Sequence, residues 1–372
     1  MPKILKSKIT FLLSLLTIST VCFCLNIEDA KNAFLAKKYS VSYSLCSQLI
    51  AENIDLKQAF LLRGKSQFYL HKYSEAIKDL SEAAKDSSLA AEVLEYAGHA
   101  YFRLGQLDDA LRFFDRSLLN NPNNAKVLHS RAYIFASKEQ YQSAINDYSK
   151  SYQLNPYNSQ LLFDRGYVYL VSGQHNKALV DLLAYVQQDS TDYQGFFNLA
   201  VCYYETNDVE KSIYYYSKSL LLKNDFVDAY FNRALAYEKG KEYQKAIEDY
   251  TKFLALEPND FEIYFSRASV YETIGKKVAA LEDYNKTLTL EPNFTAAIFN
   301  RALLLKSMGK NLEAIEDYKK LIKLDANDME AYNNIGLVYF GISNITKACH
   351  YWKIASDAAY PDSRKYHTLY CK

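Results

Sequence analysis

The sequence predicts an all-α solenoid of ten helix-turn-helix units, each 34 residues long. Three observations support this fold class. A residue pattern recurs every 34 positions without insertion or deletion, small and apolar residues follow helical spacing, and glycine or proline marks fixed places. Position 1 denotes the first residue of each unit. The units begin near residues 23, 57, 91, 125, 159, 193, 227, 261, 295 and 329.

Two helical patterns follow one another within every unit. Apolar or small residues occupy positions 4, 7, 8 and 11, and then positions 20, 24 and 27, which places each set on one helix face. Small residues at positions 8 and 20 allow the two helices to approach closely. The third and fourth units show this register as Gly98, Tyr101, Ala110, Phe114 and Ala132, Phe135, Ala144, Tyr148.

Helix-ending residues separate these two patterns. Four units carry glycine at position 15, where a left-handed residue would end the first helix. Four units carry proline at position 32, which stops the second helix. These residues are Gly105, Gly173, Gly275 and Gly309, and Pro122, Pro156, Pro258 and Pro292.

The pattern resembles that of the tetratricopeptide repeat family over residues 25–362. This resemblance implies antiparallel helix pairs stacked into a right-handed superhelical solenoid with a concave groove. Pentatricopeptide repeats, which read RNA, share the plan but have a period of about 35 residues. The constant 34-residue period and the balance of 44 basic against 43 acidic residues argue against nucleic acid as a partner.

Both ends of the chain differ from the repeats. Residues 1–24 combine a basic start with an apolar run from Ile9, which predicts a signal peptide and export to the periplasm or the exterior. An uncleaved membrane anchor is the alternative, and membrane contact is expected only if the segment is retained. Residues 363–372 are predicted to form a short capping tail.

Four cysteines remain after residue 24, and no two of them form a CxxC pair. We interpret Cys46, Cys202, Cys349 and Cys371 as small packing residues. A disulfide between Cys349 and Cys371 is the alternative, because the tail can fold back on the last repeat in an oxidising compartment.

Arginine at position 7 and aspartate at position 23 occur together in six units and are replaced together elsewhere, for example by Leu199 and Tyr215. The joint replacement occurs within one unit and not with the next, which predicts an ion pair between the two helices of one unit. A partly buried arginine without its partner would be destabilising. The predicted pairs are Arg63–Asp79, Arg131–Asp147, Arg165–Asp181, Arg233–Asp249, Arg267–Asp283 and Arg301–Asp317.

Helical geometry directs positions 2, 6, 9 and 13 away from the packed face and toward the expected groove. Amides at position 6 can donate to and accept from a peptide backbone, and exposed apolar residues at position 9 can contact its side chains. The amides resemble the asparagine ladder of some tetratricopeptide superhelices; ordinary solvated polar residues are the alternative. The candidate peptide-binding residues are Asn198, Asn232, Asn300 and Asn334, with Tyr133, Tyr167, Val201, Leu235, Leu303 and Leu337.

The sequence contains no nucleophile–base set, phosphate loop or metal-ligand cluster. We therefore expect no enzymatic activity, cofactor, metal site or small-molecule substrate. The favoured hypothesis is a scaffold or adaptor that binds an extended polypeptide segment in the groove. The alternatives are a lumenal cochaperone-like protein and a membrane-anchored assembly factor.

Overall fold

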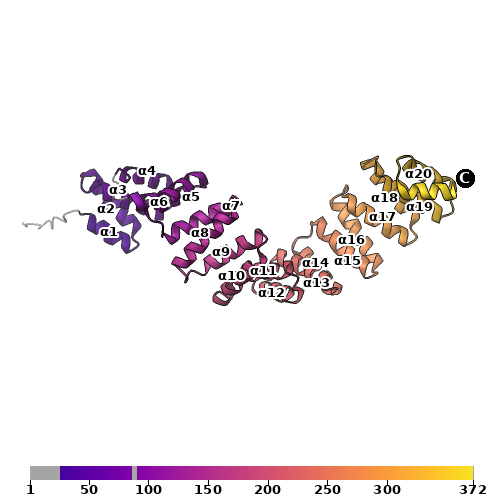
Figure 1. The fold of residues 1–372 in the computed structure, drawn as a ribbon, viewed down its shortest axis with the longest axis horizontal. Helices are drawn as coiled ribbons and strands as arrows, with labels where there is room; N and C mark the ends of the chain where they lie inside the picture. The colour runs from indigo at the N-terminus through magenta and orange to yellow at the C-terminus, as the bar shows by residue number, and fades with distance from the viewer. Residues whose placement is uncertain (1–25, 86–89, 372) are drawn as a thin grey trace, which may run out of the picture. The chain divides into compact units, whose positions relative to one another are not determined.

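The computed structural model describes residues 26–85 and 90–371, which form α-helices without any β-strand (Figure 1). The chain divides between Tyr157 and Asn158 into two compact units, which are described separately. The first unit contains α1 (Ile27–Leu35), α2 (Tyr39–Ala51), α3 (Leu56–Tyr69), α4 (Tyr73–Ala83), α5 (Ala90–Arg103), α6 (Leu107–Asn120), α7 (Ala125–Ser137) and α8 (Tyr141–Leu154).

The second compact unit contains thirteen helices. They are α9 (Gln160–Val171), α10 (His175–Gln188), α11 (Tyr193–Glu205), α12 (Val209–Leu222), α13 (Val227–Lys239), α14 (Tyr243–Leu256), α15 (Phe261–Thr273), α16 (Lys277–Leu290), α17 (Thr295–Ser307), α18 (Asn311–Leu324), α19 (Met329–Gly341), α20 (Ile345–Asp357) and α21 (Pro361–Tyr370).

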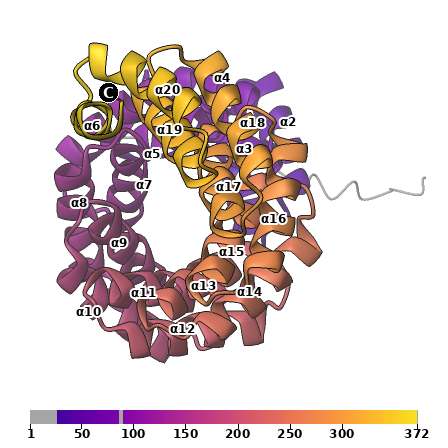
Figure 2. The same ribbon diagram turned by 90° about the vertical axis from the view of Figure 1, so that its right-hand side faces the viewer.

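The predicted all-α solenoid of helix pairs is confirmed. Each odd-numbered helix from α1 to α19 packs on the following even-numbered helix, and within each compact unit the pairs stack on one another in chain order. In the second unit the first helices α11, α13 and α15 lie on the inner side of the array, while α12 and α14 lie on the outer side (Figure 2). First helices of neighbouring repeats also contact each other directly, as α9 does with α11 and α11 with α13.

The first helix of every repeat ends at a left-handed residue in position 15. The four predicted glycines have φ near 75°, as the sequence indicated. The other six units use residues with a Cβ in the same conformation, which costs more than glycine does. Those residues are Lys37, His71, Glu139, Asn207, Lys241 and Ser343.

Small residues at position 8 allow the close approach of paired helices. In the tenth repeat, a Cβ placed on Gly336 would lie 2.3 Å from Nε1 of Trp352, the fully buried side chain at position 24. In the third repeat, a Cβ on Gly98 would lie 2.7 Å from the ring of Phe114. Larger residues at these places would therefore force the helices apart.

All six predicted arginine–aspartate pairs form. In each pair the guanidinium Nε and Nη2 donate to the two carboxylate oxygens at 2.6–2.9 Å, which is the strong bidentate geometry. For example, both Arg233–Asp249 distances are 2.7 Å.

The arginines of these pairs also contact the preceding repeat, which the sequence analysis did not predict. In five pairs the remaining Nη1 donates to an oxygen at position 25 of the preceding repeat, as Arg233 does to Ser217 Oγ at 2.8 Å. The sequence reasoning compared charges only, whereas these acceptors are mostly neutral. They are Ser47, Asp115, Ser217, Thr251 and Asn285.

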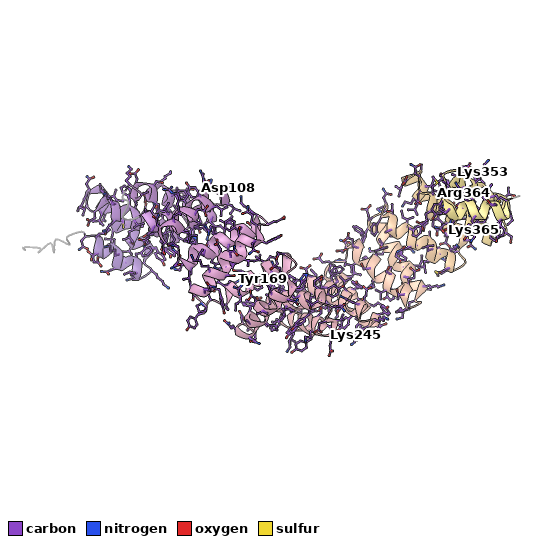
Figure 3. All side chains as sticks on the ribbon, in the orientation of Figure 1. Asp108, Tyr169, Lys245, Lys353, Arg364 and Lys365 are labelled. Carbon is purple, nitrogen blue, oxygen red and sulfur yellow. A yellow bond between two sulfur atoms is a disulfide. The ribbon has the colours of Figure 1, made fainter. Side chains whose placement is uncertain are left out.

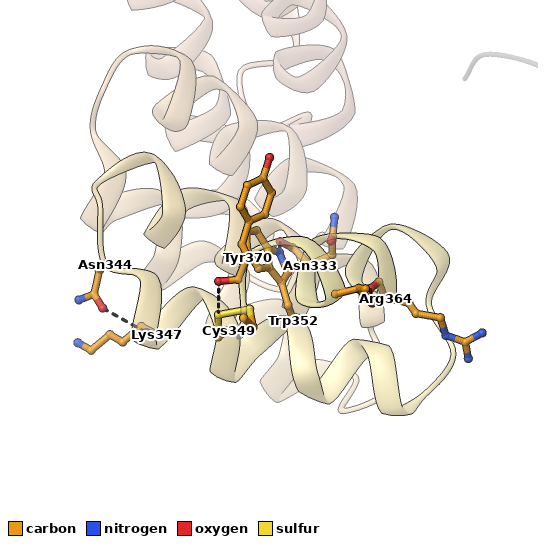
Figure 4. The surroundings of a disulfide bond; sticks show 9 residues. Asn333, Asn344, Lys347, Cys349, Trp352, Arg364 and Tyr370 are labelled. Atoms are coloured by element: carbon orange, nitrogen blue, oxygen red, sulfur yellow. Dashed lines mark hydrogen bonds between the residues drawn. A yellow bond between two sulfur atoms is a disulfide. The ribbon is translucent and has the colours of Figure 1, made fainter.

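The C-terminal residues form a helix, α21, that packs on α20 and begins at Pro361, before the start of the predicted tail. Cys349 of α20 and Cys371 form a disulfide beside Trp352 and Tyr370 (Figure 4). The packing interpretation is therefore wrong for these two cysteines, whereas Cys46 and Cys202 are buried free thiols as expected.

Aromatic rings lie on the inner side of this C-terminal cap, and charged side chains lie on its outer side. Trp352 stacks on Tyr366 of α21 with centroids 5.1 Å apart, and its Nε1 donates to the Asn333 carbonyl at 3.3 Å. The labelled side chains of Arg364 and Lys365 project from the cap into solvent (Figure 3). The cap thus covers the apolar end of the last repeat with a polar outer surface, as terminal repeats require.

The predicted signal peptide, residues 1–24, lies outside the described residues. Among the helices that the structure does describe, none has the length and hydropathy needed to cross a membrane.

Candidate functional site

The candidate amides at position 6 differ in their exposure. Asn232 and Asn300 are half-buried, whereas Asn198 and Asn334 are only 9% and 8% exposed. Asn232 Nδ2 donates to the Asp228 carbonyl at 2.8 Å. Two of the four candidate amides, Asn198 and Asn334, are therefore buried.

The apolar residues at position 9 are the more accessible part of the candidate site. Tyr133, Tyr167 and Leu303 are 54%, 48% and 37% exposed. The remaining three, Val201, Leu235 and Leu337, are half-buried. Tyr133 belongs to the first compact unit, while all other candidate residues belong to the second.

Phenylalanines at position 5 pack against the connection that leads to the next repeat. Phe197 contacts Phe226 with ring centroids 4.9 Å apart, and Phe265 contacts Phe294 at 5.1 Å. Because Phe226 and Phe294 occupy position 34, the last residue of a unit, each contact joins a first helix to the connection that follows its own pair.

One hollow in the second compact unit lies between α13 and α15. Its volume is about 430 Å³. The apolar part of its lining consists of Phe231, Phe253, Ile263, Phe265 and Phe294. Its polar part consists of Asp228, Asp260, Glu262 and Ser266. This aromatic and acidic hollow, called the α13–α15 pocket below, adjoins the position 6 residues of the seventh and eighth repeats.

A second hollow, of about 380 Å³, lies on the first helices of the first compact unit. Phe34, Leu35 and Leu61 provide apolar lining. Its charges are already paired: Lys31 lies 3.6 Å from Glu28, and Lys65 forms an ion pair with Glu92. Lys65 also lies over the rings of Phe34 and Tyr96 at 4.8 and 5.2 Å from their centroids.

Carboxylates at position 12 are held by tyrosines of their own repeat. The Tyr250 hydroxyl donates to Glu238, and the Tyr284 hydroxyl donates to Glu272 at 3.0 Å. Burial raises the pKa of Glu238, while the bond from Tyr250 lowers it. These groups serve packing of the helix pair. In the part of the chain that the structure covers, no group of His, Cys, Asp and Glu side chains is arranged to hold a metal ion.

Comparison with known families gives a consistent assignment. Models described as tetratricopeptide repeat match residues 61–125, 97–159, 227–260 and 261–294, and a model described as TPR repeat matches residues 302–342. The chain is a tetratricopeptide repeat protein. No curated protein sequence matches it.

Solved structures with a similar fold include MamA, which is 25% identical and covers 45% of this tetratricopeptide repeat protein and 92% of its own chain, with a TM-score of 0.44. YrrB, described as a TPR protein with an unusual peptide-binding site, is 16% identical, with coverages of 50% and 95% and a TM-score of 0.45. A tetratricopeptide repeat protein from Parabacteroides merdae is 20% identical, with coverages of 67% and 99% and a TM-score of 0.47.

Sequence reasoning missed the acidic lining of the α13–α15 pocket in this tetratricopeptide repeat protein. Position 2 is Asp228 in the seventh repeat and Glu262 in the eighth, but it is Gln160, Gln194 and Ala296 in neighbouring repeats. Glu92 and Glu330 also occupy position 2, so a comparison along the chain finds acids in four repeats, and only the structure shows that two of them line one pocket.

Proposed function

We propose that this tetratricopeptide repeat protein is a non-enzymatic scaffold that binds an extended polypeptide segment along the first helices of its second compact unit. Tetratricopeptide repeats are protein-interaction modules, and the observation that carries the proposal is the exposure of Tyr167 and Leu303 at position 9. Both side chains project from the same position of their repeats as the half-buried Leu235.

Two of the four candidate amides support peptide binding at the same surface. Asn232 and Asn300 retain exposed area beside the position 9 residues, so an incoming backbone can bond to them as it loses water. Asn198 and Asn334 are largely buried and are assigned to the support of the first helices.

A phage-displayed library of short random peptides, panned on the full mature chain, tests this function. The wild-type protein should enrich related peptides, and a variant carrying Asn232→Ala, Asn300→Ala and Leu303→Ser should bind them at least about tenfold more weakly, because each unpaired group costs about 1–3 kcal/mol. The paired changes Glu248→Ala and Lys252→Ala, on the exposed face of α14, provide the control. Undiminished affinity of the triple variant would place binding elsewhere.

We also propose that the protein is exported and that residues 1–24 are a cleaved signal peptide. The Cys349–Cys371 disulfide supports this proposal, since such bonds persist in oxidising compartments. Mass spectrometry of the native protein should find a chain that begins near Leu25. Recovery of the intact N-terminus in a membrane fraction would instead favour the anchored alternative, and its recovery in the cytosol would exclude export.

A further inference from the structure

The α13–α15 pocket combines aromatic rings with carboxylates that the protein itself does not neutralise. Asp260 accepts hydrogen bonds from the backbone N–H groups of Glu262 and Ile263 at 3.0 and 3.2 Å, so it caps the start of α15. Asp228 and Glu262 have no ion-pair partner within residues 26–85 and 90–371. No lysine or arginine is among the residues that line the pocket.

A related ring cluster lies in the sixth repeat, two repeats before the one that supplies Phe265 and Phe294 to the pocket, and it holds a cation. There, Phe226 contacts Tyr193 at 5.0 Å and Phe197 at 4.9 Å. Lys223 Nζ lies 4.7 Å from the centroid of Tyr193 and 5.6 Å from that of Phe226. A lysine of the chain therefore occupies the space over these rings, in the geometry of a cation–π contact.

The eighth repeat has the equivalent aromatic rings, but it has no lysine at the position equivalent to Lys223. Phe294 contacts Phe261 at 5.2 Å and Phe265 at 5.1 Å, which reproduces the earlier cluster closely. The residue that corresponds to Lys223 is Glu291. The local charge has thus changed from positive to negative beside rings whose faces attract cations. Of this cluster, Phe265 and Phe294 also line the α13–α15 pocket, whereas Phe261 and Glu291 lie outside its lining.

From these observations we propose that the α13–α15 pocket binds a lysine or arginine side chain of the polypeptide. The inference rests on the proposed peptide-binding function and adds a chemical requirement to it. The apolar stem of the basic residue lies against Phe231 and Phe265, and its charged end approaches Asp228 and Glu262. Peptides with an acidic residue at this point are repelled.

First-turn acids also stabilise helices by interacting with the helix dipole, so the test needs a matched control. Asp228 and Glu262 lie in the first turns of α13 and α15. Glu330 lies in the first turn of α19, at the same repeat position as Glu262 and outside the pocket lining. Glu262→Gln and Glu330→Gln are thus the same chemical change at equivalent helix starts.

The experiment pans the random-peptide library on the wild-type chain and on three variants: Asp228→Asn with Glu262→Gln, Glu262→Gln alone, and Glu330→Gln. Synthetic copies of the enriched peptides are then titrated, each with its basic residue kept or replaced by norleucine. We expect the wild-type chain and the Glu330→Gln variant to enrich peptides with a lysine or arginine at one fixed place. The double pocket variant should bind these peptides about tenfold more weakly, and the norleucine peptides should not distinguish it from wild type.

The outcomes separate this inference from the function on which it rests. Enriched peptides without a fixed basic residue, or basic peptides that bind the double variant as tightly as wild type, would overturn the pocket assignment while leaving peptide binding intact. Loss of binding in the Glu330→Gln variant to the same extent would show that the acids act through helix stability, and it would overturn the assignment too. A wild-type chain that enriches no peptide would overturn the proposed function itself.

Discussion

The contact between Arg233, Asp249 and Ser217 should couple neighbouring repeats as well as the helices of one repeat. Arg233 and Asp249 side chains are only 17% and 6% exposed, and Arg233 Nη1 reaches Ser217 of the preceding repeat. Burial raises the pKa of Asp249, although the facing guanidinium lowers it, so desolvation of the carboxylate outweighs its attraction to Arg233. Both residues can therefore be replaced together by an uncharged pair with little loss of stability, whereas replacement of only one of them destabilises the protein.

Removal of one partner leaves the other charge largely buried without compensation. Loss of a fully buried partner costs about 3–5 kcal/mol; because Arg233 retains some exposure, we expect about 2–4 kcal/mol for Arg233→Leu or Asp249→Leu. The combined change Arg233→Leu and Asp249→Tyr reproduces the Leu199 and Tyr215 pair of the sixth repeat. It should recover at least about half of the single-variant loss.

Native-state hydrogen exchange of the amides in α13 and α14 measures this loss where it occurs, which matters because long repeat arrays do not unfold in a single step. Exchange in α12 should also accelerate in Arg233→Leu, since the bond to Ser217 is lost. Ser217→Ala removes this inter-repeat acceptor alone and should affect α12 more than α14. Strictly additive single and double changes would refute the pairing argument, and an unchanged α12 would refute the coupling between repeats.

Two further predictions concern the C-terminal cap and the buried His99 of α5. Cys371→Ser should release α21 and expose Trp352, the only tryptophan of the chain, so its fluorescence should shift to the red and the last repeat should lose about 2–3 kcal/mol; an unshifted spectrum would contradict a capping role for the disulfide. Burial lowers the pKa of His99 to about 4, against about 6.5 in the unfolded chain. Because the folded state favours neutral His99, the free energy of unfolding has its full value above about pH 6.5. It falls by at most about 3 kcal/mol as the pH drops to about 4. Urea unfolding of His99→Leu should lack this part of the wild-type pH dependence, and equal pH dependence in both proteins would contradict it.

The sequence was sufficient for the repeat fold and for the paired residues within it. A strict period identifies equivalent positions, so the joint replacement of Arg and Asp is visible in one chain without relatives. The acceptor at position 25 was harder to recognise, since serine, threonine, asparagine and aspartate all fulfil the role. The structure shows its role: before the sixth and tenth repeats, which lack the arginine, this position holds Leu183 and Lys319, whereas before the third repeat, which also lacks it, the position still holds Ser81.

The burial of individual side chains and the strain of the backbone could not be predicted from the repeat pattern. Helical spacing gives the direction of Asn198 but not its burial, which depends on how closely neighbouring first helices contact one another. Left-handed His71 and Glu139 carry no sequence signal of their conformation. Their backbone is set by the packing of the helix pair around the turn, which outweighs the local preference of each residue.

Differences between repeats therefore fall into two kinds, and the distinction bears on where a partner binds. When arginine is lost at position 7, aspartate is lost at position 23 as well, so the change is compensated within the protein and needs no external explanation. The change from Lys223 to Glu291 has no such compensation: the three rings of the Phe294 cluster remain, and no lysine or arginine lines the adjoining α13–α15 pocket, to which position 2 of two repeats contributes Asp228 and Glu262. An uncompensated charge beside a conserved internal ring geometry is the feature expected where the missing cation comes from another molecule.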